Sequence, residues 1–472
     1  MKSGISMNAG ALVRRQLSLM PEIAPRLTAS ADGKPFTQRF VLDRVISNSL
    51  AFLRGDAGAE RLVVLPGLRG VGKTTILLQL YQRIAGEGVP PERRLYLPCD
   101  RLAALPGASL TRALHAYEAI LGGDLAVQAK RTFIFLDEAQ YIPDWGLAVK
   151  AVHDEARAVQ VVVSGSSALA LRMNADVARR AVTWRVAPLG LLEYLALTGR
   201  RIRGGPSLEE LTAIDEPGAA LKFFKKQART VGTELTLVPD LEHLVRRFLF
   251  AGSLPSTMDA LDLRRAWGKT YGSIERIVNV DLPGIGRFDR STLQTAMQAI
   301  TLVADSPDRS VQKMAAELSL PPATVLSLMD ALARADLLLE VPVAGSAGRG
   351  ARRKKRRYFA APSMMAAVLD ASGIDPSERQ GPLLEAAVAG VLSRVPGSSL
   401  HYDDADGGAD FVLQGRVRVA VEVGWGSKGE RQVRSSMARH RCPWGILVHE
   451  CPAPFLSGRV VHVPVEQFLA LG

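Results

Sequence analysis

The sequence predicts an α/β fold built on a doubly wound parallel sheet, followed by helical segments and a smaller α/β domain. Apolar runs at 62–65, 133–136 and 161–163 read as buried parallel strands, because they lack the alternation of a sheet with one solvated face. Segments of helical period separate these runs, which is the order of a βαβ sheet. A chain of 472 residues is too long for one ordinary core, so we expect about three domains.

A glycine-rich loop follows the first of these strands. The stretch LVVLPGLRGVGKTT, residues 62–75, contains the pattern G-x-x-x-x-G-K-[ST] between a strand and a helix. The glycines let backbone N–H groups point inward, and the helix N-terminus adds positive charge, so the loop predicts an anion site. We expect Lys73 to reach the β- and γ-phosphates of ATP and Thr74 to place its hydroxyl on Mg²⁺. The residues expected to bind the nucleotide here are Gly67, Gly70, Gly72, Lys73, Thr74 and Thr75.

Two carboxylates follow the apolar run FIFL at 133–136. A buried parallel sheet places its site at the carboxyl ends of its strands, which is where Asp137 and Glu138 stand. We expect Asp137 to hold Mg²⁺ through water or through Thr74. Glu138 is expected to orient and polarise the attacking water.

The next strand, VQVVVSGSS, ends in serines. A polar side chain at this strand end can sense the γ-phosphate or hold the attacking water, which makes Ser164 and Ser166 candidates. The alternative is an ordinary strand end, since Ser and Gly end many strands.

Five short stretches, spread over nearly the whole chain, resemble a bacterial and archaeal group of AAA-type ATPases: GLRGVGKTT, FIFLDEAQ, VVVSGSSALAL, APLGLLEYLAL and FLFAGSLP. The resemblance implies that Arg179 or Arg180 acts on the γ-phosphate of a neighbouring subunit, and hence a homo-oligomer. The alternative for both arginines is a solvated charge at a helix end. It also implies that Pro255 packs near the base of the nucleotide, although the residues alone indicate only a turn.

In that group the nucleotide domain precedes a helical lid, a winged helix and a nuclease-like domain of unknown function. We therefore expect a lead-in at 1–40, an AAA-type ATPase domain at 41–190, a lid with an insertion at 191–285, a winged helix at 286–370 and a PD-(D/E)xK nuclease-like domain at 381–472. The winged-helix segment, 286–370, can also be predicted from its residues. SVQKMAAEL and ATVLSLMDALARADLLLEV each put apolar side chains on one helical face, and the turn SLPP joins them into a helix-turn-helix.

Six consecutive basic residues occupy the strand that returns from the wing: Arg352, Arg353, Lys354, Lys355, Arg356 and Arg357. Strand alternation puts Arg353, Lys355 and Arg357 on one face. Contact with nucleic-acid phosphates is the natural use of such charge. The alternative is a packing or dimerisation module whose basic residues are solvated.

Three carboxylates near the C-terminus resemble the core of the PD-(D/E)xK fold, with Glu385 on a helix and Asp410 and Glu422 on a hairpin. Such a trio is suited to a second Mg²⁺. The lysine of the pattern, two residues after the glutamate, is Gly424 here, and Lys428 is the close replacement. Neighbouring glycines make it costly in entropy to hold Lys428 in place, so we expect no DNA cleavage.

Composition bears on partners and compartment. The net charge of +12 and pI near 9.8 suit a polyanionic partner such as DNA. Three cysteines without a CxxC pair indicate a reducing cytoplasm. No window approaches an 18-residue apolar span, so no membrane segment is expected.

These observations predict a cytoplasmic, Mg²⁺-dependent ATPase whose nucleotide state governs engagement of DNA through a basic winged helix. Two alternatives stay open. One is a signalling switch or assembly scaffold that hydrolyses ATP slowly and binds protein through its winged helix. The other is an ATP-gated nuclease.

Overall fold

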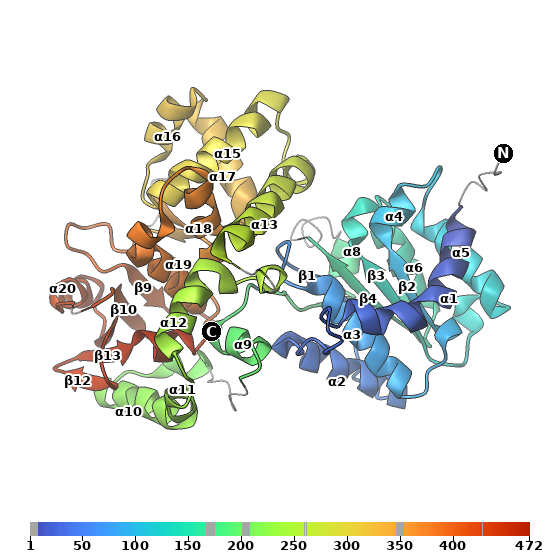
Figure 1. Cartoon of the computed structure of the whole chain (residues 1–472), viewed down its shortest axis with the longest axis horizontal. Helices are drawn as coiled ribbons and strands as arrows, with labels where there is room; N and C mark the ends of the chain where they lie inside the picture. The colour runs from blue at the N-terminus through green and yellow to red at the C-terminus, as the bar shows by residue number, and fades with distance from the viewer. Residues whose placement is uncertain are drawn as a thin grey trace. The chain divides into compact units, whose positions relative to one another are not determined.

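The computed structural model describes residues 8–166, 175–200, 208–258, 260, 262–345, 354–426 and 428–472. The chain forms two compact units, Met1–Ala187 and Pro188–Gly472 (Figure 1). The segment predicted as a lead-in, 1–40, belongs to the first unit. The segments predicted as lid, winged helix and nuclease-like domain all belong to the second.

The first unit is built around a parallel sheet. In the part of the chain that the structure describes, this sheet has five strands in the order β2-β3-β4-β1-β5. They are β1 (Leu62–Pro66), β2 (Arg94–Pro98), β3 (Thr132–Asp137), β4 (Val159–Gly165) and β5 (Val182–Thr183). All neighbouring strands are parallel, and the carboxyl ends of β1 and β4 are aligned because Pro66 pairs with Gly165.

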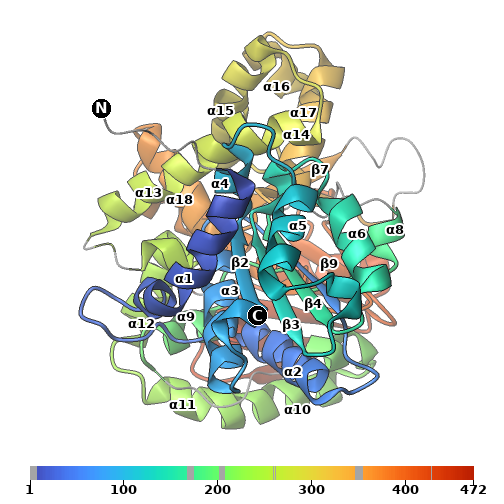
Figure 2. The same ribbon diagram turned by 90° about the vertical axis from the view of Figure 1, so that its right-hand side faces the viewer.

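Helices cover both faces of this sheet (Figure 2). The helices of this unit are α1 (Ala9–Leu27), α2 (Phe40–Arg54), α3 (Lys73–Gly86), α4 (Cys99–Ala103), α5 (Leu110–Leu121), α6 (Trp145–Glu155) and α8 (Ala175–Ala178). One core cluster joins α1, α4, α5 and α6 to alternate side chains of β1 to β4. On the other face, the Phe52 ring of α2 packs against Phe133, and the Tyr81 ring of α3 against Phe135. The prediction of a doubly wound α/β sheet is confirmed.

Strand alternation decides which face receives the acidic end of β3. Phe133 and Phe135 point toward α2 and α3, and residues two apart share a face. Asp137 therefore lies on the side where α3 begins, next to Thr74. The local period of β3 thus brings the carboxylate to the glycine-rich loop.

The second unit begins with helical segments. Their α-helices up to the first hairpin are α9 (Leu191–Leu197), α10 (Pro217–Gln227), α11 (Thr233–Thr236), α12 (Leu241–Arg247), α13 (Leu263–Arg276), α14 (Leu282–Ile285), α15 (Arg290–Asp305), α16 (Val311–Leu318) and α17 (Pro322–Arg334). Helix α16 begins where Ser310 accepts a hydrogen bond from the Lys313 N–H, and it ends at Ser319, which is left-handed. The two helices predicted from SVQKMAAEL and from ATVLSLMDALAR are confirmed as α16 and α17.

An antiparallel hairpin of β6 (Leu338–Pro342) and β7 (Lys355–Phe359) follows. The predicted glycine-rich tip lies mostly outside the described residues, as do Arg352 and Arg353. Val341 and Tyr358 of this hairpin belong to one buried cluster that also includes residues of α9, α10, α12 and the last 90 residues of the chain. The hairpin is therefore part of the same core as the C-terminal sheet.

The C-terminal sheet is mixed. Within the described residues it has six strands in the order β12-β13-β11-β10-β9-β8, with β10, β11 and β13 parallel and the other pairs antiparallel. Its strands are β8 (Ser399–His401), β9 (Phe411–Gln414), β10 (Arg418–Val423), β11 (Trp444–His449), β12 (Phe455–Ser457) and β13 (Val460–Pro464). The remaining helices are α18 (Pro362–Ala371), α19 (Gln380–Leu392), α20 (Arg431–His440) and α21 (Val465–Leu469). The predicted hairpin of Asp410 and Glu422 corresponds to β9 and β10, and the predicted helix of Glu385 is α19.

Among the helices that the structure describes, none combines the length and the apolar character that crossing a bilayer requires.

Candidate nucleotide-binding site

The glycine-rich loop after β1 has the backbone that its sequence requires. Gly70 and Gly72 have φ of 85° and 89°, a left-handed conformation that L side chains rarely adopt. Gly67 serves a different purpose, because a Cβ there would lie 2.3 Å from the carbonyl oxygen of Val186. The loop therefore depends on glycine at all three predicted positions.

Lys73 opens helix α3 and is buried. Its ammonium donates hydrogen bonds of 3.0 Å to the carbonyl oxygens of Gly67 and Leu68, and Glu138 Oε1 lies 3.9 Å away. Thr74, one residue further, is exposed, and Thr75 is half-buried in the same first turn. The start of α3 therefore offers an ammonium, a reachable hydroxyl and the positive end of a helix to an anion.

Asp137 is the most connected side chain of the site. Its Oδ2 accepts hydrogen bonds from Thr74 Oγ1 at 2.8 Å and from the Tyr96 hydroxyl at 2.7 Å. Its Oδ1 accepts from the Ser164 hydroxyl. Burial raises the pKa of Asp137, and the hydrogen bonds from Ser164, Tyr96 and Thr74 act in the opposite direction. A carboxylate next to an exposed hydroxyl is the oxygen donor set that Mg²⁺ prefers, so these residues fit the predicted ion.

Glu138 has a left-handed backbone with φ of 55°, which is uncommon outside glycine and is often found at functional sites. Its N–H donates to Ser164 Oγ at 3.3 Å, and Gln140 donates from Nε2 to its Oε2. Ser164 therefore contacts both carboxylate residues, and its predicted role toward the γ-phosphate stays a prediction. Ser166 differs, because its hydroxyl is buried and has no hydrogen-bond partner among the described residues.

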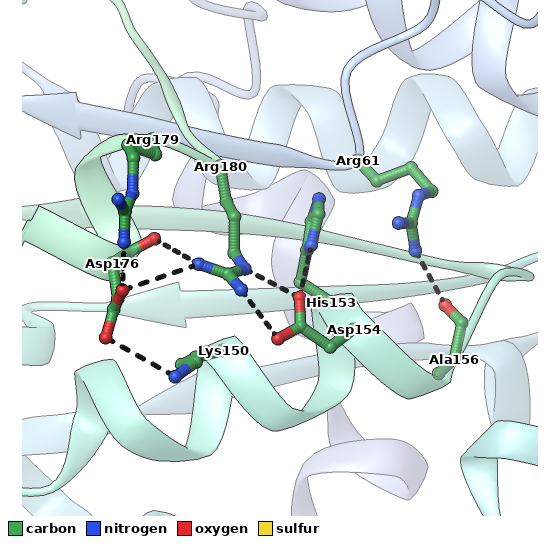
Figure 3. Close-up of polar contacts among 8 residues, drawn as sticks. All are labelled: Arg61, Lys150, His153, Asp154, Ala156, Asp176, Arg179 and Arg180. Carbon is green, nitrogen blue, oxygen red and sulfur yellow. Dashed lines mark hydrogen bonds and ion pairs between the residues drawn. The ribbon is translucent and has the colours of Figure 1, made fainter.

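The two candidate arginines have different surroundings (Figure 3). Arg180 donates from Nε and one terminal nitrogen to the two oxygens of Asp154, at 2.6 and 2.9 Å, and also to the carbonyl oxygen of Asp176. The hydrogen bonds from Arg180 are the main cause that lowers the pKa of Asp154 to about 2. Arg180 thus ties α8 to α6.

Arg179 has one partner in the figure, Asp176, three residues earlier in the chain. Its side chain is 72% exposed, against 26% for Arg180. Of the two, Arg179 is the guanidinium that another molecule can reach.

Pro255 lies in the second unit, at the start of a single 3₁₀ turn. The glycine of its motif has a packing reason of its own, because a Cβ at Gly252 would lie 2.6 Å from the Tyr194 ring. Ser253 is buried and its hydroxyl lies 2.5 Å from that of Ser363. The stretch is therefore integrated into the core of the second unit, and its contact with a nucleotide base stays a prediction.

Most basic side chains of strand β7 form ion pairs within the second unit. Arg357 is 2% exposed and its Nε lies 3.3 Å from Glu340 Oε1, and Lys355 pairs with the same carboxylate. The predicted alternation is correct for Lys355 and Arg357, but their shared face is turned toward Glu340 instead of solvent. Because a buried guanidinium is not accessible to a polyanion, the predicted phosphate contact by Arg357 is wrong for this conformation.

On the opposite side of β7, Arg356 lies over the Tyr402 ring and 3.9 Å from Asp410. Lys354 is the exposed member of the run that the structure describes, at 72%, with Asp404 3.4 Å away. Arg352 and Arg353 lie outside the described residues.

Two of the three C-terminal carboxylates, Asp410 and Glu422, are paired with cations of the chain itself, and Glu385 accepts a hydrogen bond from the Tyr358 hydroxyl at 3.4 Å. Lys428 Nζ lies 2.6 Å from Glu422 Oε1 and 3.7 Å from Asp410, so the expectation that flanking glycines would keep it away is wrong. Burial, with the neighbouring Asp410, raises the pKa of Glu385 and of Glu422 to about 7. Within the described residues, no group of three or more His, Cys, Asp or Glu side chains is placed to hold a metal ion.

Sequence reasoning missed three residues near the candidate site. Tyr96 contacts Asp137, and Gln140 contacts Glu138. Arg39 is buried and donates to the carbonyl oxygens of Val71 in the loop, at 2.7 Å, and of Ala187, at 3.0 Å. The position of Tyr96 near the carboxyl end of a strand was the available signal. Nothing in the local pattern around Arg39 indicates its contacts.

Comparison with known proteins identifies one domain of the chain and one relative that covers most of it. A family model described as an AAA domain matches residues 59–195. An uncharacterised protein from Methanocaldococcus jannaschii is 32% identical over 420 residues, which cover 87% of this chain and 85% of that protein.

Solved structures are more distant. The Aeropyrum pernix ORC1 protein in complex with DNA is 16% identical, with a TM-score of 0.31, over 75% of this chain and 96% of that one. The Thermotoga maritima RuvB Holliday junction branch migration motor is also 16% identical, with a TM-score of 0.27, over 66% and 92%. Both TM-scores are low, so neither structure indicates the function of this chain.

Proposed function

The chain belongs to the same family as the Methanocaldococcus jannaschii protein, and its residues 59–195 match an AAA domain. We propose that it is a Mg²⁺-dependent ATPase whose nucleotide state governs engagement of DNA. The observation that supports the ATPase is the convergence of Lys73, Asp137 and Glu138 at one edge of the sheet. Thr74 Oγ1 lies 2.8 Å from Asp137, and Lys73 Nζ lies 3.9 Å from Glu138.

Each of these side chains has a part in hydrolysis. Lys73 would exchange its carbonyl partners for the β- and γ-phosphates, with the loop N–H groups around them. Thr74 and Asp137 would hold Mg²⁺, which supplies neutralising charge to the phosphate oxygens. Glu138 would accept the proton of the water that attacks the γ-phosphorus, so that ADP and phosphate leave. Phosphate release by the full chain, measured with and without DNA, tests this function directly.

Engagement of DNA is the second half of the proposal. Helices α16 and α17 and the hairpin β6–β7 follow one another as the helices and wing of a winged helix do. The chain has a net charge of +12, which favours a polyanionic partner. Because Lys355, Arg356 and Arg357 are paired internally, the phosphate contacts would come from Lys354 and from Arg352 and Arg353.

We expect the triple variant Arg352→Glu/Arg353→Glu/Lys354→Glu to weaken DNA binding about equally for all duplex sequences. Loss of three phosphate contacts should reduce the slope of log affinity against log salt by roughly 3, since each contact releases about one counterion. Fluorescence anisotropy of the full chain over a salt series measures this. The full chain is needed because the hairpin shares its core with the C-terminal sheet. Lys225→Glu, at an exposed lysine of α10, is the matched control, and an equal effect in both proteins would contradict a specific role.

A different function has one observation in its favour. The internal ion pairs of β7 are what a packing module needs, and they support the alternative of an ATP-dependent switch or scaffold that binds protein. An unchanged salt slope in the triple variant, together with ATP hydrolysis that DNA does not alter, would favour this alternative.

We expect the C-terminal domain not to cut DNA. Lys428, beside Glu422, stands where a nuclease would need its lysine, but Arg356 lies 3.9 Å from Asp410. Within the described residues the three carboxylates are not placed to hold a metal ion together, and phosphodiester hydrolysis in this fold depends on that ion. Incubation of the full chain with linear, nicked, forked and single-stranded DNA, in Mg²⁺ or Mn²⁺ with ATP, is the measurement. Metal-dependent cleavage that disappears in both Asp410→Ala and Lys428→Ala would contradict this prediction and favour the ATP-gated nuclease.

A further inference from the structure

Gln140 connects the residues that follow β3 to those that follow β4. It follows Glu138 by two residues, in the short 3₁₀ turn Ala139–Tyr141, and its side chain is only 9% exposed. Its Nε2 donates to Glu138 Oε2, and its Oε1 accepts from the Ser166 N–H at 3.2 Å. One amide therefore joins the carboxylate after β3 to the residue that follows β4.

The end of β4 is hydrogen-bonded to the start of the glycine-rich loop. Gly165 pairs with Pro66, and its carbonyl oxygen accepts from the Gly67 N–H at 3.2 Å. Ser166, the next residue, is 2% exposed, and its hydroxyl has no partner among the residues that the structure describes. Gln140 therefore contacts the residue next to Gly165, which is itself hydrogen-bonded to the loop at Gly67.

We infer that Gln140 is a positioning residue that holds the Glu138 carboxylate in the direction set by the end of β4. The inference rests on the proposed ATPase function. Because Nε2–H of Gln140 occupies Oε2 of Glu138, the other oxygen, Oε1, is left to accept the proton of the attacking water. Oε1 is also the atom that lies 3.9 Å from Lys73, so the two oxygens of Glu138 have different partners.

The amide of Gln140 is needed as a donor on one side and an acceptor on the other. Gln140→Glu keeps the size of the side chain and the acceptor for the Ser166 N–H, but at neutral pH it loses the donor to Glu138 and places a like charge beside it. Gln140→Ala removes both contacts. The isosteric variant thus separates positioning of Glu138 from support of β4.

We expect Gln140→Glu and Gln140→Ala each to lower kcat by about 10²-fold, the usual cost of a misplaced catalytic group. The dissociation constant for ATP and the KM should stay within about twofold, because neither contact of Gln140 is part of the phosphate loop. Phosphate release, nucleotide binding and the thermal midpoint are measured on the full chain. The isosteric Gln140→Glu protein serves as the folded reference if Gln140→Ala loses stability.

A double-mutant cycle shows whether Gln140 acts through Glu138. When Glu138→Gln is already present, adding Gln140→Ala should change the residual single-turnover rate by less than about twofold, because the group it positions is gone. A kcat of Gln140→Glu near that of the wild type, or an equal loss from Gln140→Ala in both backgrounds, would overturn the inference. If the wild type does not hydrolyse ATP, or Glu138→Gln hydrolyses it as fast, the proposed function fails and the inference falls with it.

Discussion

Lys73→Ala should abolish or severely weaken ATP binding, whereas Glu138→Gln should bind ATP normally and fail to turn it over. Lys73 is a buried ammonium that donates hydrogen bonds to two carbonyl oxygens of the phosphate loop. Charged hydrogen bonds to two phosphates would replace them, so their loss should cost at least about 3 kcal/mol, or over 100-fold in Kd.

Glu138→Gln removes a proton acceptor and leaves the phosphate loop unchanged. We expect kcat to fall by about 10²–10⁴-fold, the range for a lost general base, with Kd for ATP within about twofold of wild type. Nucleotide titration by fluorescence and phosphate release give the two quantities separately. Arg69→Ala is a control for a general disturbance of the loop, because Arg69 lies in the same loop and its side chain donates a hydrogen bond to the Tyr141 hydroxyl. Equal loss of nucleotide binding in the Lys73 and Glu138 variants would refute the division of roles.

Arg179→Ala should lower kcat by about 10³-fold or more without altering ATP binding, the effect of removing an arginine that acts on a neighbouring γ-phosphate. Arg179 is the exposed arginine of the pair, whereas Arg180 is engaged by both oxygens of Asp154. ATPase activity per mole should accordingly rise with protein concentration in the wild type.

Subunit mixing provides the decisive measurement. Glu138→Gln protein has an intact arginine, and Arg179→Ala protein has an intact carboxylate, so a mixed assembly contains complete sites and should be more active than either variant alone. Arg180→Ala is the matched control, because removal of a residue that ties α8 to α6 within its own subunit should not be complemented in this way. Activity strictly linear in concentration, with a monomeric sedimentation profile, would refute catalysis in trans.

The candidate nucleotide-binding site could be predicted from the sequence because its parts are close together in the chain or at aligned strand ends. The glycine loop needs left-handed φ at Gly70 and Gly72, and only a few residue types tolerate that conformation, so the loop has a recognisable pattern. Asp137 and Glu138 end an apolar strand, and parallel strands bring their carboxyl ends to one edge. Helix caps such as Ser310 are equally local.

Partnership between distant residues was decided by the tertiary structure alone. Tyr96 reaches Asp137 across 41 residues, and Arg39 reaches Ala187 across 148. Strand alternation correctly put Lys355 and Arg357 of β7 on one face, but only packing of the hairpin into the second core turned that face toward Glu340. A periodicity specifies which side chains share a face. Which face is buried depends on the apolar surface that another part of the chain presents to it.

Packing also decides that Arg179 is exposed and Arg180 is half-buried. The two are neighbours in the sequence and have the same chemistry, so no pattern distinguishes an arginine that faces a partner from one that holds a helix. The distinction comes from Asp154, which α6 places within reach of Arg180. Residue types and spacing thus determined the phosphate loop, its carboxylates and the order of strands and helices, because these depend on backbone preferences within a few residues. Which charges meet inside the chain and which stay exposed was decided by packing, since a charge is paired only by what the fold brings beside it.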